Sequence, residues 1–283
     1  MSQKLKVALV QMTAGPEVVP NLDAAEALIR KAAKGGAEFV LTPENTSLIE
    51  PNKAHAFEKS FLEEKHPGLS RFSALARELK IWLLIGSMSI RVEEGKLANR
   101  SFLFDPQGSI VARYDKIHLF DVDLPSGETY RESKTIHPGA QAVVADTPWG
   151  GVGLTICYDL RFAYLHRALA QAGARIITVP AAFTVPTGKA HWEILLRARA
   201  IETGSFVLAP AQCGLHADGR RTYGHSLIVA PWGEILAEAG EEPCIITAEL
   251  DMALVAKARA MIPVLQHDRN FAKPQPLLRA AGE

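Results

Sequence analysis

The chain has 283 residues, 48% of them hydrophobic and 22% charged, which is ordinary for a water-soluble globular protein with one large core. Lysines plus arginines number 31 and aspartates plus glutamates also number 31, so the basic surface of a nucleic-acid-binding protein is not expected. No secretion signal opens the chain and no apolar run is long enough for a membrane span, so we expect a cytoplasmic protein with neither nucleic-acid nor membrane partners.

The first half predicts a strand–helix–strand unit followed by a helix, a strand and a hairpin. Residues 6–12 form the first strand, and Asn21 is expected to cap a helix that ends at Gly35 and Gly36. The second strand, residues 37–43, ends at a proline. The later elements are expected at residues 69–80, at 81–87 and, around a Pro-Gln-Gly turn, at 99–114.

The second half predicts the same order of elements. They are expected at residues 151–156, 160–172, 174–180, 190–203, 205–210 and 224–239. Two segments also match in sequence, because residues 99–112 align with 224–237 and residues 36–43 align with 173–180, each without a gap. Two matches in the same order indicate an internal repeat.

Such a repeat predicts two mixed sheets that face each other, with helices on the outside. This is an α/β fold, a four-layer α-β-β-α sandwich with an internal pseudo-two-fold repeat. The domain is expected to cover residues 1–262. Residues 263–283 are rich in proline and polar residues and are expected to form a C-terminal arm.

Three polar residues follow strands of this predicted fold. Glu44 and Cys157 each follow a buried strand, one in each half, and ligands bind in α/β sheets beyond such strand ends. Lys116 follows the hairpin of the first half. A helix start after Cys157 and the charge of Lys116 would both lower the pKa of the thiol. Taken singly, the three residues could equally be a solvated glutamate, a buried inert thiol and a solvated lysine, but the repeat can bring them to one rim.

No motif in the chain indicates a metal or an organic cofactor. The three cysteines, Cys157, Cys213 and Cys244, are widely spaced, which argues against a disulfide framework and against a zinc site. The chain has no Gly-x-Ser-x-Gly elbow, no phosphate-binding loop and no His-Glu-x-x-His motif. We therefore expect catalysis without a cofactor.

The motifs around these residues resemble those of the nitrilase superfamily of carbon–nitrogen hydrolases. TPEN (42–45), YDKIHLFD (114–121) and ICYDLRF (156–162) are similar to the family's glutamate, lysine and cysteine motifs and stand in the same order. The resemblance implies a Glu44–Lys116–Cys157 triad. The segment RESKTIHPG (131–139) further implies a supporting glutamate at Glu132, for which Glu128 is a rival.

The resemblance implies hydrolysis of a non-peptide amide through a thioester. Glu44 would act as general base and acid, and Cys157 as the nucleophile. Lys116, with the backbone N–H of Tyr158, would stabilise the oxyanion. The family also implies a homodimer or a larger homo-oligomer.

Segments 188–216 and 221–233 resemble the deaminated glutathione amidases, whose substrate is split into 2-oxoglutarate and Cys-Gly in metabolite repair. The neighbouring omega-amidases, which act on 2-oxoglutaramate, are an alternative. One departure bears on this choice, because Ala163-Tyr164 stands where the branch usually has Pro-Glu.

Both candidate substrates carry carboxylates, so a cation is expected in the pocket. Arg161 is the candidate, and a structural ion pair with Asp159 or another acid is its alternative role. Phe183 and Thr187 are expected either to line the pocket or to pack within their loop.

Two further functions stay open. A nitrilase or an N-carbamoyl hydrolase would use the same triad, although the sequence Cys-Tyr-Asp argues against a dedicated nitrilase, which more often has Cys-Trp-Glu. A non-catalytic binding or scaffold protein with this fold is disfavoured by the intact triad.

Overall fold

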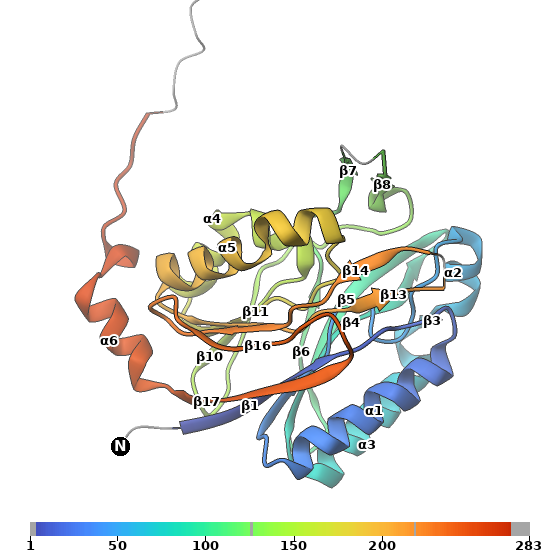
Figure 1. The fold of residues 1–283 in the computed structure, drawn as a ribbon, viewed down its shortest axis with the longest axis horizontal. Coiled ribbons are helices and arrows are strands. Elements are labelled where there is room, and N and C mark those ends of the chain that lie inside the picture. Colours follow the sequence, from blue (N-terminus) through green and yellow to red (C-terminus); the bar gives the residue numbers. More distant parts are fainter. Residues whose placement is uncertain (1–3, 125–126, 218, 273–283) are drawn as a thin grey trace, which may run out of the picture.

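Two mixed β-sheets face each other in the middle of the molecule, and helices cover their outer faces (Figure 1). The computed structural model describes residues 4–272 apart from 125–126 and 218. The predicted four-layer α/β sandwich is confirmed.

The first sheet has the strand order β17-β1-β2-β4-β5-β6, and the short β3 pairs with β4. Its strands are β1 (Lys4–Gln11), β2 (Phe39–Leu41), β3 (Phe61–Leu62), β4 (Trp82–Glu93), β5 (Lys96–Phe104), β6 (Ile110–Asp115) and β17 (Cys244–Asp251). The second sheet has the order β9-β10-β11-β12-β15-β16. Its strands are β9 (Val143–Ala145), β10 (Gly151–Leu154), β11 (Ala174–Thr178), β12 (Phe206–Ala209), β15 (Leu227–Val229) and β16 (Ile235–Glu238).

The two sheets have the same pattern of strand directions. Each begins with an antiparallel pair, continues with two parallel pairs and ends in a hairpin that pairs antiparallel with the strand before it. The hairpin β5–β6 and the hairpin β15–β16 come from the segments that match in sequence. The internal repeat is therefore present in the topology as well as in the sequence.

Helices pack on each sheet from outside. The first sheet carries α1 (Val18–Lys34) and α3 (Pro67–Leu79), and the second carries α4 (Ala163–Gln171) and α5 (Val185–Thr203). Strand β1 explains why the sandwich forms. Leu5, Val7 and Leu9 belong to the core between the sheets, whereas Ala8 and Val10 belong to the core under α1 and α3. From Val7 onward both faces of this strand are buried, so residues 7–10 are apolar without alternation.

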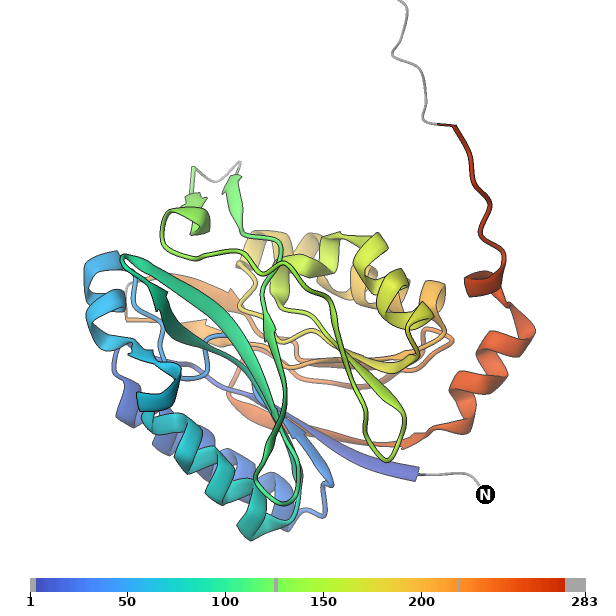
Figure 2. The same ribbon diagram turned by 180° about the vertical axis from the view of Figure 1, so that it is seen from behind.

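The remaining elements lie at the edges of the sandwich. They are α2 (Lys53–Lys59), α6 (Ala253–Met261), the pairs β7 (Asp121–Asp123) with β8 (Thr129–Arg131) and β13 (Cys213–Leu215) with β14 (Arg221–Tyr223), and the 3-10 helices η1 (Glu63–Lys65), η2 (Glu132–Lys134), η3 (Cys157–Arg161) and η4 (Val264–Gln266). The β7–β8 hairpin projects beyond the sheets, as the view from behind also shows (Figure 2).

Three expected boundaries were wrong. Asn21 does not cap α1, which begins at Val18; instead the buried Asn21 amide donates hydrogen bonds to the carbonyls of Gly15 (2.8 Å) and Ser47 (2.9 Å). The helix expected at 160–172 is the 3-10 helix η3 followed by α4, and α5 begins before residue 190, with a proline in its first turn.

The start of the expected C-terminal arm contacts the domain. Arg167 of α4 donates to the Val264 carbonyl (2.8 Å), and Gln171 donates to the Leu265 carbonyl (3.2 Å). Residues 273–283 lie outside the described part of the chain, so the division at residue 262 stays a prediction. Within the described residues, no helix combines the length and the apolar character needed to cross a membrane.

Candidate active site

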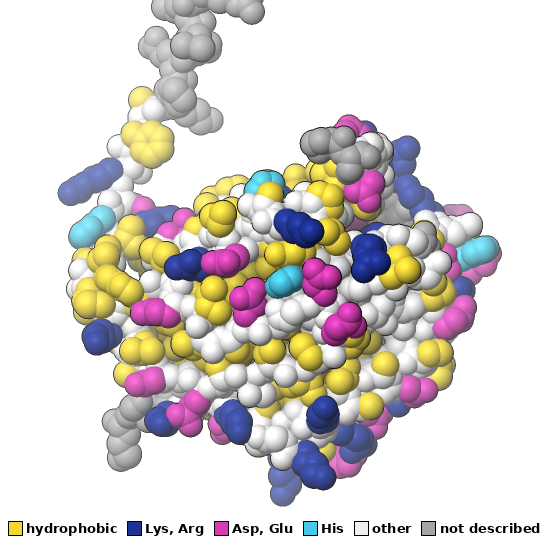
Figure 3. Space-filling model, in the orientation of Figure 1, with side chains coloured by type: hydrophobic (Ala, Val, Ile, Leu, Met, Phe, Trp, Pro, Cys, Tyr) yellow, Lys and Arg dark blue, Asp and Glu magenta, His cyan; other side chains and the backbone are white. Residues whose placement is uncertain are grey.

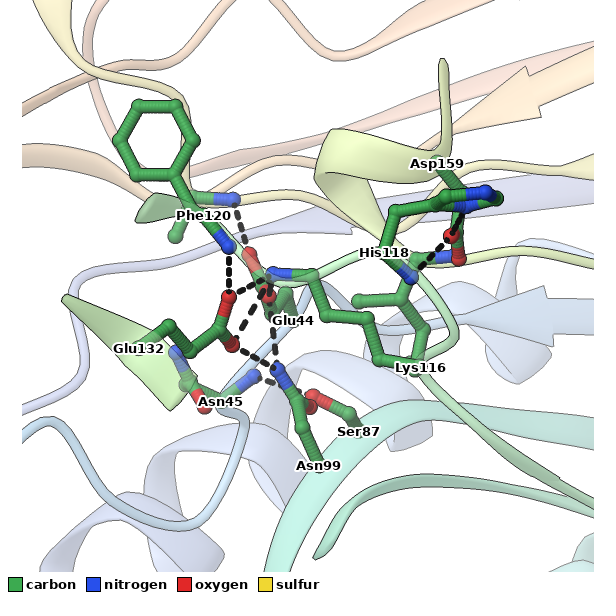
Figure 4. Close-up of polar contacts among 12 residues, drawn as sticks. Glu44, Asn45, Ser87, Asn99, Lys116, His118, Phe120, Glu132 and Asp159 are labelled. Atoms are coloured by element: carbon green, nitrogen blue, oxygen red, sulfur yellow. Dashed lines mark hydrogen bonds and ion pairs between the residues drawn. The ribbon is translucent and has the colours of Figure 1, made fainter. Parts of the chain in front are cut away.

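Four side chains from separate parts of the chain meet where strands of the two sheets end. Glu44 follows β2 and Lys116 follows β6 in the first sheet, Cys157 follows β10 in the second, and Glu132 begins η2 after β8. The Lys116 ammonium lies 2.9 Å from a carboxylate oxygen of Glu44 and 2.9 Å from one of Glu132 (Figure 4). The structure thus brings the predicted triad and the predicted supporting glutamate together.

The Glu44 carboxylate is buried and is held from several sides. One oxygen accepts hydrogen bonds from Lys116 Nζ (2.9 Å) and from Asn99 Nδ2 (2.8 Å), and the other accepts from the Ala182 backbone N–H (2.9 Å). The Cys157 thiol is close enough to Glu44 to contribute to lowering the pKa of this carboxyl. A carboxylate in this position can serve as the base for the thiol proton.

Glu132 holds Lys116 from the other side. Its two oxygens lie 3.1 and 2.9 Å from the ammonium, and one of them also accepts the Phe120 backbone N–H at 2.7 Å. Glu128 is exposed on the β7–β8 hairpin and is not among the residues that line the cavity around the triad. Of the two candidates, Glu132 is therefore the one that reaches Lys116.

Asn99 of β5 is a site residue that the sequence reasoning missed. Its amide nitrogen donates to both glutamates, at 2.8 Å to Glu44 and at 3.4 Å to Glu132, so one side chain fixes the distance between the two carboxylates. One signal was available in the internal repeat, because Asn99 aligns with Gly224 in the second half. A polar residue present in only one copy of a repeat is a candidate for function and not for folding.

Cys157 sits in a turn with unusual backbone geometry. Its φ angle is +51°, in the left-handed region, and its N–H donates to the Pro180 carbonyl at 2.9 Å. The next N–H, that of Tyr158, lies in the first turn of η3 and has no partner within that helix. It is therefore available to a ligand beside the sulfur.

The pKa of the Cys157 thiol is raised well above its ordinary value, which contradicts the expected lowering. Burial is the largest cause, and the negative charge of Glu44 adds to it. Lys116 and the Ala182 N–H lower the pKa, as the charge argument requires, but they do not compensate. The expected helix start is also only the short η3, so its dipole is weak. The resting sulfur is accordingly a neutral thiol next to a base.

The other two members of the triad remain charged. Burial alone would raise the pKa of Glu44, but the Lys116 charge and the hydrogen bonds from Cys157, Lys116 and Asn99 lower it overall. Burial would lower the pKa of Lys116, but the charges of Glu132 and Glu44 raise it well above its ordinary value. The cluster therefore holds two carboxylates and one ammonium in a buried place.

A cavity of about 440 Å³ opens over this cluster. Glu44, Lys116 and Cys157 line it, and so do Phe183 and Thr187. Three further cationic side chains line it as well, namely Lys53, Arg131 and Arg220. Its volume lies in the range that holds small molecules, and its cations suit an anionic one.

Arg161 lies one side chain away from the cavity and is not among its lining residues. Its guanidinium carbon is 5.9 Å from the centre of the Tyr158 ring and 5.6 Å from that of Phe183, and both rings line the cavity. One guanidinium nitrogen of Arg161, Nη1, lies 3.3 Å from His191 Nδ1. Asp159 accepts its hydrogen bonds from other groups, so the alternative ion pair between Arg161 and Asp159 is not formed. A role for Arg161 in binding substrate stays a prediction.

Ala163 and Tyr164, the departure from the related branch, do not line the cavity either. The Tyr164 hydroxyl contacts His118 Nε2 at 2.5 Å. Tyr164 therefore contacts the segment that carries Lys116, and neither Ala163 nor Tyr164 forms part of the described cavity wall.

Residues 6–260 match the carbon–nitrogen hydrolase family. A deaminated glutathione amidase from Yersinia enterocolitica is 43% identical to this chain, and the match covers 96% of both proteins. An omega-amidase from Homo sapiens is 39% identical, over 94% of this chain and 95% of the relative.

Solved structures agree with these matches. The C. elegans NitFhit protein superimposes with a TM-score of 0.89 at 36% identity, over 95% of this chain and 66% of that larger one. An amidase from Nesterenkonia superimposes with a TM-score of 0.79 at 29% identity, over 94% of both chains. In that amidase the active-site cysteine carries a covalently added acetamide group from fluoroacetamide.

Proposed function

This chain belongs to the carbon–nitrogen hydrolase family, and we propose that it hydrolyses a linear amide, deaminated glutathione, through a thioester at Cys157. The observation that carries the proposal is the buried cluster of Glu44, Lys116 and Cys157 at the wall of a cavity whose lining also includes Lys53, Arg131 and Arg220. The reaction class follows from the family, and the residue roles and the substrate are our proposal.

In the first step the Cys157 sulfur attacks the amide carbon while its proton passes to Glu44. This concerted route is supported by the raised pKa of the thiol, because a standing thiolate is not formed at neutral pH. The negative charge moves from the Glu44 carboxylate to the oxygen of the tetrahedral intermediate. Lys116 touches Glu44 before the transfer and, with the Tyr158 N–H, stabilises the oxyanion after it.

In the second step Glu44 gives its proton to the leaving nitrogen, and the carbon–nitrogen bond breaks. The acyl group remains on Cys157 as a thioester. Water then attacks the thioester carbon and loses a proton to Glu44, which returns it to the departing sulfur. Glu132 takes no part in these proton transfers and holds the Lys116 ammonium in place.

The substrate is proposed from the relatives and from the charge of the cavity. The Yersinia relative is named for deaminated glutathione, a substrate that carries one carboxylate on the acyl side and one on the leaving dipeptide. Lys53, Arg131 and Arg220 line the cavity and can attract such a substrate. Arg161 beyond the Phe183 ring is a further candidate cation.

The alternative substrate is 2-oxoglutaramate, because the human omega-amidase is nearly as similar as the first relative. It has the same acyl group but releases ammonia. A nitrilase or carbamoyl hydrolase would use the same residues on another electrophile, and a scaffold protein would use none of them. The amidase names of the relatives and the intact triad favour an amidase over both.

A side-by-side assay tests the substrate. Purified protein is given deaminated glutathione and 2-oxoglutaramate, and kcat/KM is compared from the release of 2-oxoglutarate. We expect a preference for deaminated glutathione of at least about tenfold, since its leaving dipeptide offers the cavity a second carboxylate and additional surface to bind. A preference for 2-oxoglutaramate would favour the omega-amidase, and turnover of neither would reject both substrates.

A second copy of this chain is the proposed partner, with α5 at the interface. Ile194 and Ile201 on α5 and Trp232 in the β15–β16 turn are 68, 54 and 50% exposed. We refer to these three residues as the α5 patch. Hydrophobic side chains gather over α5 and towards α6 in Figure 3. A cytoplasmic location is proposed as well, because a catalytic thiol needs a reducing compartment to stay unoxidised.

A further inference from the structure

A chain of polar side chains lies beside the active site without facing the cavity. It consists of Asp159, His118 and Tyr164, none of which lines the cavity. Asp159 is completely buried, two residues after the nucleophile, whereas Tyr164 is 66% exposed. A buried carboxylate is costly unless hydrogen bonds satisfy it, so its partners indicate what it is for.

One oxygen of Asp159 closes the turn that carries Cys157. It accepts the Ile156 N–H at 2.9 Å, while the Asp159 N–H donates back to the Ile156 carbonyl at 3.0 Å. This pair of bonds brackets Cys157, whose positive φ costs a residue with a side chain about 1–2 kcal/mol. The turn therefore needs outside support to keep the sulfur in place.

The same carboxylate reaches the segment that carries Lys116. It accepts the Tyr114 hydroxyl at 2.7 Å, and its other oxygen accepts the His118 N–H at 3.0 Å and contacts His118 Nδ1 at 2.6 Å (Figure 4). Tyr114 and His118 lie two residues before and two residues after Lys116. One carboxylate thus ties both sides of the lysine to the turn of the cysteine.

His118 is in turn held from its outer side. Its ring stacks on Phe162 with centroids 3.5 Å apart, and its Nε2 lies 2.5 Å from the Tyr164 hydroxyl. Because a carboxylate only accepts, Nδ1 carries the hydrogen, and in the neutral ring Nε2 then accepts from Tyr164. Phe162 and Tyr164 both follow Cys157 along the chain. The segment after Cys157 therefore packs on, and hydrogen-bonds to, the segment that carries Lys116 and His118.

We propose that Asp159 is a positioning residue that holds the Cys157 sulfur in place relative to Lys116. Tyr164 in turn holds the Asp159 carboxylate in place through His118. The proposal rests on the proposed thiol chemistry. Asp159 touches no substrate, so its loss should lower kcat and leave KM nearly unchanged. A displacement of about 1 Å in reacting groups can lower the rate about 10²-fold.

Asp159→Asn tests the proposal with almost no change in volume. All four groups around the Asp159 carboxylate donate hydrogen bonds to it. In the variant an NH₂ group replaces one carboxylate oxygen, so this NH₂ group must face N–H or O–H donors. We expect kcat to fall about 10²-fold, KM to change less than about threefold, and the alkylation of Cys157 by iodoacetamide to slow by about tenfold or more.

Asp105→Asn is the matched control. Asp105 also accepts backbone N–H groups in a turn, from Gln107 (2.9 Å) and Ser109 (2.8 Å), but in the β5–β6 hairpin away from the site. This variant should change kcat and the alkylation rate less than about twofold. An equal loss in both variants would overturn the proposal, as would an Asp159→Asn variant that raises KM and keeps kcat.

Tyr164→Phe decides the matter if Asp159→Asn does not fold. The exposed hydroxyl is removed while the ring remains, so the fold should be kept. The loss of one hydrogen bond to His118 should lower kcat about 3–10-fold without a change in KM. A kcat equal to that of the wild type would show that Tyr164 does not hold Asp159 in place through His118. If the wild type cleaves neither amide, the proposed function fails, while the Cys157 alkylation rates still test the positioning.

Discussion

At the scale of single residues, Lys116 determines whether the buried cluster can exist. Its ammonium lies between Glu44 and Glu132, and all three side chains are buried or nearly so. Without the ammonium, two carboxylates would be left close together with no counter-charge. We therefore expect the lysine to support the folded structure in addition to its proposed role at the oxyanion.

Lys116→Met should lower the free energy of unfolding by about 3–5 kcal/mol, the range for breaking a buried ion pair, and should abolish turnover. The double variant Lys116→Met with Glu132→Gln removes one of the two stranded charges. It should recover part of the stability and none of the activity. Thermal unfolding and kcat measure the two effects. Recovered activity in the double variant would contradict the role of Lys116 at the oxyanion.

The raised pKa of Cys157 predicts an unusual pH dependence of alkylation. The rate at Cys157, followed on its own peptide, should show no rise centred near the ordinary thiol value of about 8.5. The alkylation rate should fall only at acid pH, below the ordinary glutamate pKa of about 4.3. The reason is that the pKa of Glu44 is lowered, so its carboxylate stays ionised down to that pH.

Glu44→Gln serves as the comparison for this measurement. It removes a negative charge that raises the thiol pKa, while burial and Lys116 remain, so the thiol pKa should fall and the inflection should shift to lower pH than in the wild type. An ordinary thiol inflection in the wild type would contradict the neutral-thiol account.

The residues that could be predicted are those whose position in the repeat marks them. Glu44 follows β2 of the first copy and Cys157 follows β10 of the second; the two strands are not equivalent in the repeat, but both are parallel strands of the crossover units, so a common rim was foreseeable. Asn99 was missed because it lies inside a strand, where an asparagine on one face of β5 gives no periodic signal. The thiol pKa was predicted in the wrong direction because burial, its largest cause, is a property of the folded chain.

At the scale of elements, β4 controls how closely the two halves of the site approach. A Cβ on Gly86 would lie 2.1 Å from the Thr42 carbonyl oxygen and 2.5 Å from both the Pro43 oxygen and Pro180 Cβ. Pro43 precedes Glu44, and the Pro180 carbonyl accepts the Cys157 N–H. The absence of a side chain at Gly86 therefore lets the segment that carries Glu44 approach the segment that holds Cys157.

Gly86→Ala should destabilise the protein by about 2 kcal/mol or more and should lower kcat, because backbone atoms would have to move apart. Gly240→Ala is the control, since a Cβ there would meet nothing within 4 Å, and its effect should stay within about 0.5 kcal/mol. Chemical denaturation of both variants measures the difference. Equal stabilities would show that β4 does not limit the approach.

The elements were predictable where a local pattern sets them. The apolar runs of β1, β2, β10 and β11 were found, but the start of α1 was not, because Asn21 is engaged by Gly15 and Ser47, which only the folded loop brings near. Strand β17 was not predicted. It pairs along the whole of β1 although the two strands are at opposite ends of the chain, and no local signal records such a pairing.

At the scale of the whole molecule, the repeat made the architecture predictable. The same order of elements in both halves implied two equivalent sheets, and the strand directions match pair by pair. The repeat does not indicate which outer face would meet a second copy in the proposed dimer. The α5 patch is the candidate because its large apolar side chains are exposed.

The proposed dimer predicts that the wild type has twice the mass of one chain in light scattering coupled to size exclusion. Ile194→Asp should place a charge in the α5 patch and give monomers at about 10 μM. Val19→Asp is the control, because Val19 is 60% exposed on α1 in the opposite outer layer, and it should remain dimeric. A monomeric wild type, or dissociation of both variants, would contradict an interface at α5.

The nucleophilic role proposed for Cys157 predicts that its replacement abolishes turnover without loss of the fold. The kcat of Cys157→Ala on the preferred amide should fall at least about 10⁴-fold, while its melting temperature stays close to that of the wild type. Cys213→Ala, which removes another buried free thiol, should keep its activity. If Cys157→Ala retained more than about one hundredth of the wild-type kcat, the thioester mechanism would be wrong.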